Sequence, residues 1–168
     1  MRTLYLLRHA KARREREVSD RDRQLHRRGI RQATALAAWL AQQKPPGLVL
    51  CSPSRRTRDT LALVLPALRE PPEIEFPDAL YLASPDTLRA AVHDAGEQVR
   101  ALMLVGHNDG IHQFALELTG GADVARLVGF PTGALALLEF DIGSWRELKP
   151  RSGRLAAYVD PDQLVGAA

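Results

Sequence analysis

The chain of 168 residues lacks the features that mark a disulfide framework or a membrane protein. Cys51 is the only cysteine, so no internal disulfide can form, which agrees with a cytosolic location. No apolar run approaches the roughly 18 to 20 residues that span a bilayer, and the N-terminal run Leu4 to Leu7 is too short for the core of a signal peptide. We therefore expect a cytoplasmic protein without a membrane partner.

Lysine is also scarce, because arginine supplies all but three of the 23 basic residues. The 20 acidic residues nearly offset them, leaving a net charge of +3. The planar guanidinium suits bidentate contact with phosphate or carboxylate. The arginine-rich run 11–31 has interspersed acidic residues and no aromatic residue for base stacking, so we expect a solvated rim of a phosphate site and no nucleic-acid partner.

The composition that is present, 45% hydrophobic and 26% charged, is ordinary for a globular protein. The length suits one compact domain over residues 1–168 with a core of its own. We find no internal repeat and no linker, and we expect a monomer.

Short apolar runs alternate with helical patterns as far as residue 118. The runs 3–7, 48–51 and 102–105 are typical of strands buried on both faces, and 73–76 is a weaker strand. In the last third, 133–140 and 154–159 are also predicted strands, with a possible short strand at 145–148. We expect residues 160–168 to form a loose end.

Four helices are predicted between these strands. The first begins near Arg28, and its apolar face carries Ile30, Ala33, Leu36, Ala37 and Leu40. The second has Ser52 as its N-cap and Pro53 at its first position. The third starts at Ser84-Pro85 and stops at Gly96, and the fourth runs through Ile111 to Leu118. This alternation predicts an α/β fold of three layers, with a mostly parallel central sheet and helices on both faces.

Polar clusters follow three of the predicted parallel strands. Arg8-His9 ends the first, Ser52-Pro53 with Arg55-Arg56 follows the second, and Gly106-His107-Asn108 follows the third. Since the carboxyl ends of parallel strands share one edge of the sheet, these side chains are expected to converge there, with helix N-termini behind Pro53 and Asp109. Guanidinium forks and helix amides neutralise phosphate oxygens, so the predicted occupant is a phosphoryl group.

The segments "LRHAKA", "SPSRRTRDT" and "VGHN", in this order, resemble the histidine phosphatase superfamily, and "RHA" in a short chain is similar to its SixA-type phosphohistidine phosphatases. The stretch "SDRDRQLHRRGIRQA" is similar to that subgroup's D-x-x-R-x-L-x-x-x-G segment, through Asp20, Arg23, Leu25 and Gly29. The matching segments extend from residue 4 to about residue 108. The resemblance implies a phosphoglycerate mutase-like fold.

The resemblance also implies the roles of the site residues. His9 is the nucleophile that forms a phosphohistidine, which water then hydrolyses. Arg8 and Arg56 bind phosphoryl oxygens, Arg23 adds to the pocket, and His107 donates to an oxygen that gains charge in the transition state. Arg55 is expected at the rim. His9 must be neutral to attack, and nearby arginines lower its pKa, but the sequence does not identify the acceptor that fixes its tautomer.

Larger members of the family carry a glutamate general acid after the third strand, whereas this chain has Leu82 near that position. Protonation of an alkoxide leaving group is typically worth about a hundred-fold or more, and a protonated imidazole needs it less. The missing acid therefore favours a phosphohistidine substrate. Asp78 or Asp86 remains a possible proton source if a loop bends toward the site.

Several residues receive structural interpretations. Asp109, where relatives often have proline, is expected to cap the helix at Gly110. Cys51 does not fit a cysteine phosphatase, because the position for the loop arginine is Thr57, and we expect it to end a buried strand. The spacing of His107 and His112 does not suit a metal, and no metal or cofactor is expected. We interpret His26, His93 and His112 as structural.

We therefore predict a metal-free phosphatase that acts through His9 on phosphohistidine in a protein, a reaction of signal transduction. A small-molecule phosphatase with a broad pocket is the alternative within enzymes. A phospho-ligand binding module without turnover is the alternative outside them.

Overall fold

The computed structural model describes residues 1–166, which form a six-stranded sheet with helices on both faces. The strand order is β3-β2-β4-β1-β5-β6. The strands are β1 (Arg2–Arg8), β2 (Leu48–Cys51), β3 (Glu73–Glu75), β4 (Ala101–Gly106), β5 (Leu135–Phe140) and β6 (Arg154–Val159). Strands β1 to β4 pair in parallel, and β5 and β6 add antiparallel strands at one edge. The predicted fold class is confirmed.

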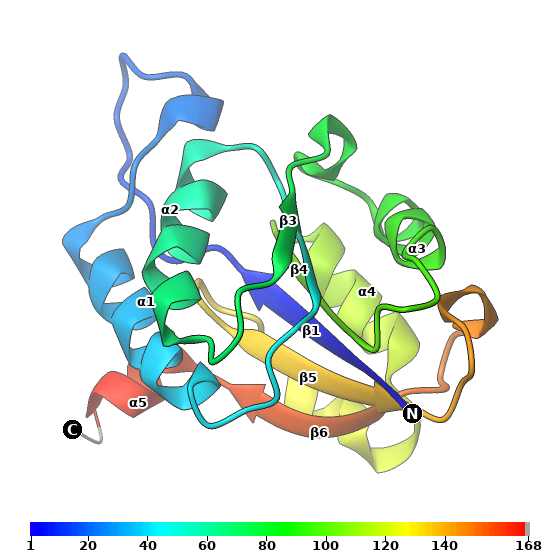
Figure 1. Ribbon diagram of the computed structural model, residues 1–168. Helices are drawn as coiled ribbons and strands as arrows, with labels where there is room; N and C mark the ends of the chain where they lie inside the picture. The colour runs from blue at the N-terminus through cyan, green and yellow to red at the C-terminus, as the bar shows by residue number, and fades with distance from the viewer. Residues whose placement is uncertain (167–168) are drawn as a thin grey trace.

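Five α-helices cover the sheet: α1 (Arg27–Leu40), α2 (Arg55–Val64), α3 (Pro85–His93), α4 (Gly110–Leu118) and α5 (Pro161–Gly166). Figure 1 shows α1, α2 and α5 on one side of the sheet and α3 and α4 on the other. The two cores follow the alternation of side chains along the strands, since Leu4 and Leu6 face α4 whereas Tyr5 and Leu7 face α1 and α2. Burial on both faces explains why these strands are continuous apolar runs.

The strand register brings the predicted polar clusters to one edge of the sheet. Arg8 pairs with Gly106, and Cys51 pairs with Val105. The backbone continues this register, because the His9 N–H donates to the Gly106 carbonyl at 3.0 Å. Residues that follow β1, β2 and β4 therefore emerge side by side.

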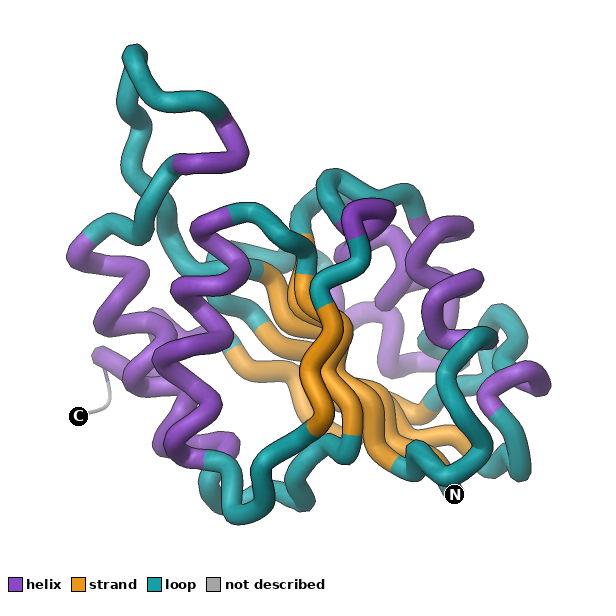
Figure 2. The backbone as a smooth tube through the Cα atoms, turned by 45° about the horizontal axis from the view of Figure 1, so that its top comes forward, coloured by secondary structure: helices purple, strands orange, loops and turns teal. Residues whose placement is uncertain are grey.

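The segment between β1 and α1 projects from the body of the molecule, and it contains a 3-10 helix at Asp20–Asp22 (Figure 2). It returns to the body where Gly29 packs against the strand exit. A Cβ on Gly29 would lie 2.1 Å from the Lys11 carbonyl oxygen, so a side chain there would force the helix away. The predicted apolar face of α1 is correct except for Ile30, which is 46% exposed because the helix turns Gly29 inward instead.

The start of α2 differs from its prediction. The helix begins at Arg55, and its N-cap is Ser54, whose hydroxyl accepts from the backbone N–H of Thr57. Ser52 does not cap the helix, because its hydroxyl is engaged by His107. The cap at Ser84 with Pro85 at the first position of α3 is confirmed, although α3 ends at His93, before Gly96.

The C-terminal third holds two further corrections. Residues Trp145–Glu147 form a 3-10 turn and no strand, closed by a capping box between Ser144 and Glu147. The turn buries Trp145, whose indole N–H donates to the Val99 carbonyl at 2.7 Å. The predicted loose end at 160–168 is wrong as far as residue 166, because α5 packs on α1; residues 167–168 lie outside the described part.

Gln32 connects this C-terminal helix to the strand exit. Its side-chain amide donates to Asp162 at 3.0 Å and to Thr132 at 3.2 Å, and its carbonyl oxygen accepts from the backbone N–H of Lys11 at 2.9 Å. Gln32 is completely buried, so these bonds are shielded from water.

Candidate functional site

A cavity of about 370 Å³ opens at the carboxyl ends of β1, β2 and β4. The side chains that line it include all five residues predicted for the site: Arg8, His9, Arg23, Arg56 and His107. Lys11, Ala12, Arg14, Asp20, Leu82, Asn108 and Thr132 complete the lining. The structure therefore brings together residues from distant parts of the chain in a cavity rich in cations.

His9 follows β1 and is 8% exposed. Its Nδ1 lies 2.8 Å from the carbonyl oxygen of Ala10, which can only accept, so Nδ1 carries the proton and Nε2 keeps its lone pair. This carbonyl is the acceptor that the sequence did not identify. Burial, followed by the nearby His107 and the cations Arg56 and Arg8, lowers the pKa of His9 to about 3, so the ring is neutral at pH 7.

Arg56 lines the cavity and is buried, with 2% of the residue exposed. Its Nη1 donates to the Asp20 carbonyl at 2.6 Å, and its Nη2 contacts the Asp20 carboxylate at 3.1 Å and Nδ1 of His107 at 3.2 Å. Its Nε has no partner among the described residues. A buried guanidinium with an unused donor is suited to bind an anion.

His107 lies beside His9, with ring centroids 5.4 Å apart. Its Nδ1 accepts from Arg56, and its Nε2 lies 2.7 Å from the hydroxyl oxygen of Ser52. Burial first, and then Arg56, lower the pKa of His107 to about 4. Since the neutral ring accepts at Nδ1, Nε2 carries the proton and donates to Ser52.

Arg8, the last residue of β1, also lines the cavity. Its Nη1 donates to the Phe130 carbonyl at 2.9 Å, and its buried Nε has no partner among residues 1–166. Asn108 donates to the same carbonyl at 2.9 Å. Burial lowers the pKa of Arg8, and the negative charge of Asp109 partly opposes this. Arg8 and Arg56 thus both line the cavity, and each has a buried Nε without a partner among residues 1–166.

Asp20 and Tyr81 also belong to this site, and the sequence analysis did not assign them a role. The Tyr81 hydroxyl donates to Asp20 Oδ2, and the Tyr81 ring meets the His107 ring edge-on, with centroids 5.5 Å apart. Arg23 binds the other oxygen of Asp20, at 3.2 Å from its Nε. The motif position of Asp20 was a signal in the sequence, whereas nothing there marked Tyr81.

Other predicted residues lie away from the cavity or act differently. Asp78 pairs with Arg21 at 3.3 Å and Asp86 with Arg89 at 2.6 Å, and neither lines the cavity. Arg55 is 54% exposed and pairs with Asp59. The remaining histidines hydrogen-bond elsewhere: His26 with the Arg28 N–H, His93 with the Leu148 carbonyl and His112 with the Leu127 carbonyl.

The predicted cap at Asp109 is wrong in its hydrogen bond. Asp109 occupies the N-cap position of α4, but its side chain accepts no backbone N–H, and its negative charge instead acts on Arg8.

Cys51 is buried as predicted, and burial raises the pKa of its thiol to about 12. Within residues 1–166 no group of three or more His, Cys, Asp or Glu side chains could hold a metal ion. No helix in this range is long and apolar enough to cross a membrane.

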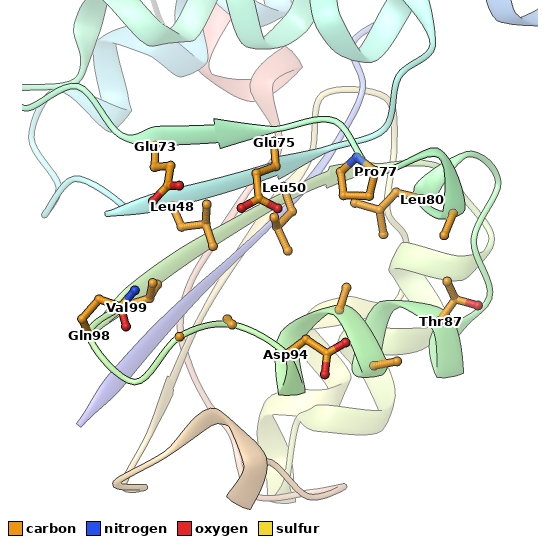
Figure 3. Close-up of a pocket in the computed structure, with 15 residues that line it drawn as sticks. Leu48, Leu50, Glu73, Glu75, Pro77, Leu80, Thr87, Asp94, Gln98 and Val99 are labelled. Carbon is orange, nitrogen blue, oxygen red and sulfur yellow. The ribbon is translucent and has the colours of Figure 1, made fainter.

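A second cavity, of about 420 Å³, lies between the β2–β3 edge and α3 (Figure 3). Glu73 and Glu75 extend into it from one side and Asp94 from the other, over the apolar side chains of Leu48 and Leu50. No basic side chain lines it among the described residues. Because three carboxylates repel a phosphate, the cationic cavity is the candidate phosphoryl site.

Known proteins resemble this chain over nearly its whole length. The family model for the histidine phosphatase superfamily (branch 1) matches residues 4–80. An uncharacterized protein of Mycobacterium leprae is 33% identical over 165 residues, covering 92% of this chain and 99% of that protein. A candidate phosphohistidine phosphatase SixA from Nakamurella multipartitia is 30% identical with a TM-score of 0.84, covering 95% and 96% of the two chains.

A second solved structure, a candidate phosphohistidine phosphatase SixA from Agrobacterium tumefaciens, is 29% identical with a TM-score of 0.81. It covers 95% of this chain and 98% of that one. The likeness therefore includes the sheet, both helical layers and the strand ends that form the cavity. On this sequence and structural agreement, the chain is a phosphatase of the histidine phosphatase superfamily, of the SixA type.

Proposed function

We propose that the protein hydrolyses phosphohistidine in a protein substrate by way of a phosphorylated His9. The observation that carries the proposal is the tautomer of His9. Its Nδ1 proton is held by the Ala10 carbonyl at 2.8 Å, so the free lone pair is on Nε2, inside a cavity lined by four arginines. Nε2 is then the nucleophile toward phosphorus.

The transfer proceeds in two steps. In the first, Nε2 of His9 forms a bond to phosphorus and the bond from phosphorus to the substrate nitrogen breaks, so the substrate imidazole leaves. Arg8 and Arg56 neutralise the phosphoryl oxygens throughout, because both cationic side chains line the cavity. In the second step, water displaces Nε2 and releases inorganic phosphate. Dividing the reaction in this way avoids direct attack of water on the substrate.

His107 is proposed to stabilise the charge on the transferring group. Its Nδ1 lies 3.2 Å from Arg56, on the side where the phosphoryl oxygens bind. In the structure the ring accepts from Arg56 at Nδ1, but the Ser52 hydroxyl can donate to Nε2 as well as accept from it, so it also permits the tautomer in which Nδ1 carries the proton once a phosphoryl oxygen lies beside Nδ1. In that tautomer the neutral ring donates to an oxygen.

The preference for phosphohistidine rests on the leaving group. Leu82 lines the cavity at the position where larger relatives are expected to carry an acid, and it offers no proton. The hydrogen bond from Tyr81, followed by the nearby Arg56, lowers the pKa of Asp20, so this carboxyl is also ionised at neutral pH. A serine or sugar alkoxide would leave without help, whereas a protonated imidazole needs none. The two SixA-type relatives, described as candidate phosphohistidine phosphatases, support the same substrate.

The test compares substrates and variants. Purified protein is assayed against a histidine-phosphorylated protein, a phosphoserine peptide and a sugar phosphate, alongside His9→Ala and the control His93→Gln, whose ring lies on α3 and bonds Leu148. We expect phosphohistidine to be the fastest substrate, and His9→Ala to lose at least about a thousand-fold in kcat. Faster hydrolysis of the esters would favour a small-molecule phosphatase, and full activity in His9→Ala would reject the mechanism.

A further inference from the structure

The second step of the proposed reaction requires an acceptor for a proton of water. As the water oxygen bonds to phosphorus, the electron pair of the P–N bond returns to Nε2 of His9, and one water proton must leave. A positioned base is worth about 10²- to 10⁴-fold at such a step. His9 cannot be that base, because Nε2 carries the phosphorus and Nδ1 carries a proton bonded to Ala10.

His107 is also unsuited to accept the proton. Ser52 engages its Nε2 at 2.7 Å, and its Nδ1 faces Arg56 at 3.2 Å. The arginines are already protonated at every pH of interest. Among the residues that line the cavity, one carboxylate remains, that of Asp20.

The Asp20 carboxylate is adjacent to the phosphoryl site. Nη2 of Arg56 contacts both Asp20 Oδ2, at 3.1 Å, and His107 Nδ1, at 3.2 Å. The carboxylate and the imidazole are therefore separated by a single guanidinium nitrogen. A phosphoryl group bound against Arg56 and His107 would lie beside Asp20, because Nη2 of Arg56 contacts both of the other side chains.

The environment of Asp20 suits a general base, because it orients the carboxylate and leaves it in contact with solvent. Arg23 holds Oδ1 at 3.2 Å and Tyr81 donates to Oδ2, so two partners fix the orientation of the carboxylate. The side chain is nevertheless 48% exposed, so an accepted proton can pass to solvent. The lowered pKa keeps the group ionised, and thus able to accept, at neutral pH.

We propose that Asp20 is the general base that takes a proton from the water attacking phosphorylated His9, an inference that rests on the proposed function. One O–P bond forms, the P–Nε2 bond breaks, and the water proton goes to Asp20 and then to solvent. Asp20 acts in the hydrolysis of the intermediate and not in its formation, since the substrate imidazole leaves without its help.

A purely structural role for Asp20 makes a different prediction. Asp20 also contacts Arg56 through its backbone carbonyl, at 2.6 Å, and through its carboxylate. If it served only to position this guanidinium, its loss would slow both steps, because Arg56 binds the phosphoryl group in each of them. A base slows only the second step. The amide of Asp20→Asn keeps an oxygen acceptor for Arg56 and removes the base, so this variant separates the two roles.

The experiment measures the two steps separately with a ³²P-labelled histidine-phosphorylated protein, rapid mixing and alkaline quench. We expect Asp20→Asn to form phosphorylated His9 at close to the wild-type rate and to hydrolyse it about a hundred-fold more slowly, so that the intermediate accumulates. Asp20→Glu, which keeps a carboxylate, should hydrolyse it faster than Asp20→Asn. The control Asp22→Asn changes a neighbouring carboxylate that bonds Ser19 outside the cavity, and should behave as wild type.

The outcomes distinguish this inference from the proposed function. If wild-type protein releases phosphate but His9 never becomes labelled, the proposed function itself is wrong. If His9 is labelled in both proteins and Asp20→Asn hydrolyses it at the wild-type rate, Asp20 is not the base although the function stands. Equal slowing of both steps would assign Asp20 to the positioning of Arg56 alone.

Discussion

The hydroxyl oxygen of Ser52, at the end of β2, lies 2.7 Å from Nε2 of His107, at the end of β4. Both side chains are buried, and they are 55 positions apart in sequence. The parallel register of β2 and β4 brings them together, because Cys51 pairs with Val105. Ser52 is thereby the hydrogen-bond partner of Nε2 of His107.

Replacement of Ser52 by alanine should lower activity without unfolding the protein. Without the hydroxyl, Nε2 of His107 loses its hydrogen-bond partner, and a contact that fixes the orientation of the ring is removed. We expect a loss of about five-fold in kcat with a smaller change in KM, since one hydrogen bond is worth about 1 kcal/mol. The control Ser54→Ala removes the cap of α2 and should lower the thermal midpoint while leaving kcat intact. Unchanged kcat in Ser52→Ala would contradict this role.

Replacement of Arg56 by lysine should reduce kcat/KM far more than its conservative charge suggests. A lysine ammonium cannot reproduce the contacts of the guanidinium to Asp20 and His107 and also bind a phosphoryl oxygen. We expect a loss of about 10²- to 10³-fold in kcat/KM. Arg55→Lys is the matched control, because the neighbouring Arg55 is 54% exposed and pairs with Asp59. Similar values for the two variants would show that Arg56 does not bind substrate.

Between pH 5 and 8, kcat/KM should not fall through protonation of a histidine of the site. The pKa of His9 is lowered to about 3 and that of His107 to about 4, so both rings are neutral throughout this range. A nucleophile with the ordinary pKa near 6.5 would instead lose activity below that pH. The profile is measured with a substrate whose own ionisation has been determined. A fall in the corrected profile with a midpoint near 6.5 would contradict the neutral resting state.

The same two histidines should make the folded state less stable in acid. Unfolded, each takes up a proton near its ordinary pKa of 6.5, whereas the folded protein holds both neutral. Stability is therefore unaffected above pH 7 and falls as pH decreases from 6.5 toward 4, by up to about 1.4 kcal/mol per histidine per pH unit. Urea unfolding at pH 7 and pH 5 measures this, and His9→Gln and His107→Gln should each reduce the slope. Parallel slopes in all three proteins would refute the assignment.

The thiol of Cys51 should be unreactive in the native protein. It is buried, and burial raises the pKa of its thiol to about 12, so almost none is thiolate at pH 7. We expect iodoacetamide to leave the native protein unlabelled and its kcat unchanged, with labelling only after unfolding. Cys51→Ala should retain activity. Inactivation by the reagent in step with labelling of Cys51 would indicate thiol chemistry.

The strands were predictable because burial on both faces leaves an uninterrupted apolar signal. The predicted run 48–51 coincides with β2. The start of α2 could not be predicted, because Ser52 and Ser54 are equally good N-caps by residue type. Ser54 is the N-cap, because the hydroxyl of Ser52 is engaged by the distant His107. Residues 145–148 were misassigned because the capping box at Ser144 and Glu147, which favours a tight turn, outweighs the strand preference of Trp145.

The residues of the candidate site also fall into those that the sequence could place and those that it could not. The residues that follow strands directly, such as His9 and His107, could be placed at one edge from topology alone. Asp20 and Tyr81 could not, because they lie in irregular segments, and the hydrogen bond between them spans 61 positions. The path of a loop is set by such tertiary contacts and leaves little periodic pattern in the sequence.

Gln32 connects α5 to the residues that follow β1, close to His9. The side chain that receives the N–H of Lys11, two residues beyond the proposed nucleophile, is itself anchored by Asp162. Deleting α5, or replacing Asp162 with a residue that cannot accept a hydrogen bond, would remove this contact of Gln32. The residues that follow β1 would then be held less firmly. We therefore expect truncations that remove α5 to change the position of His9.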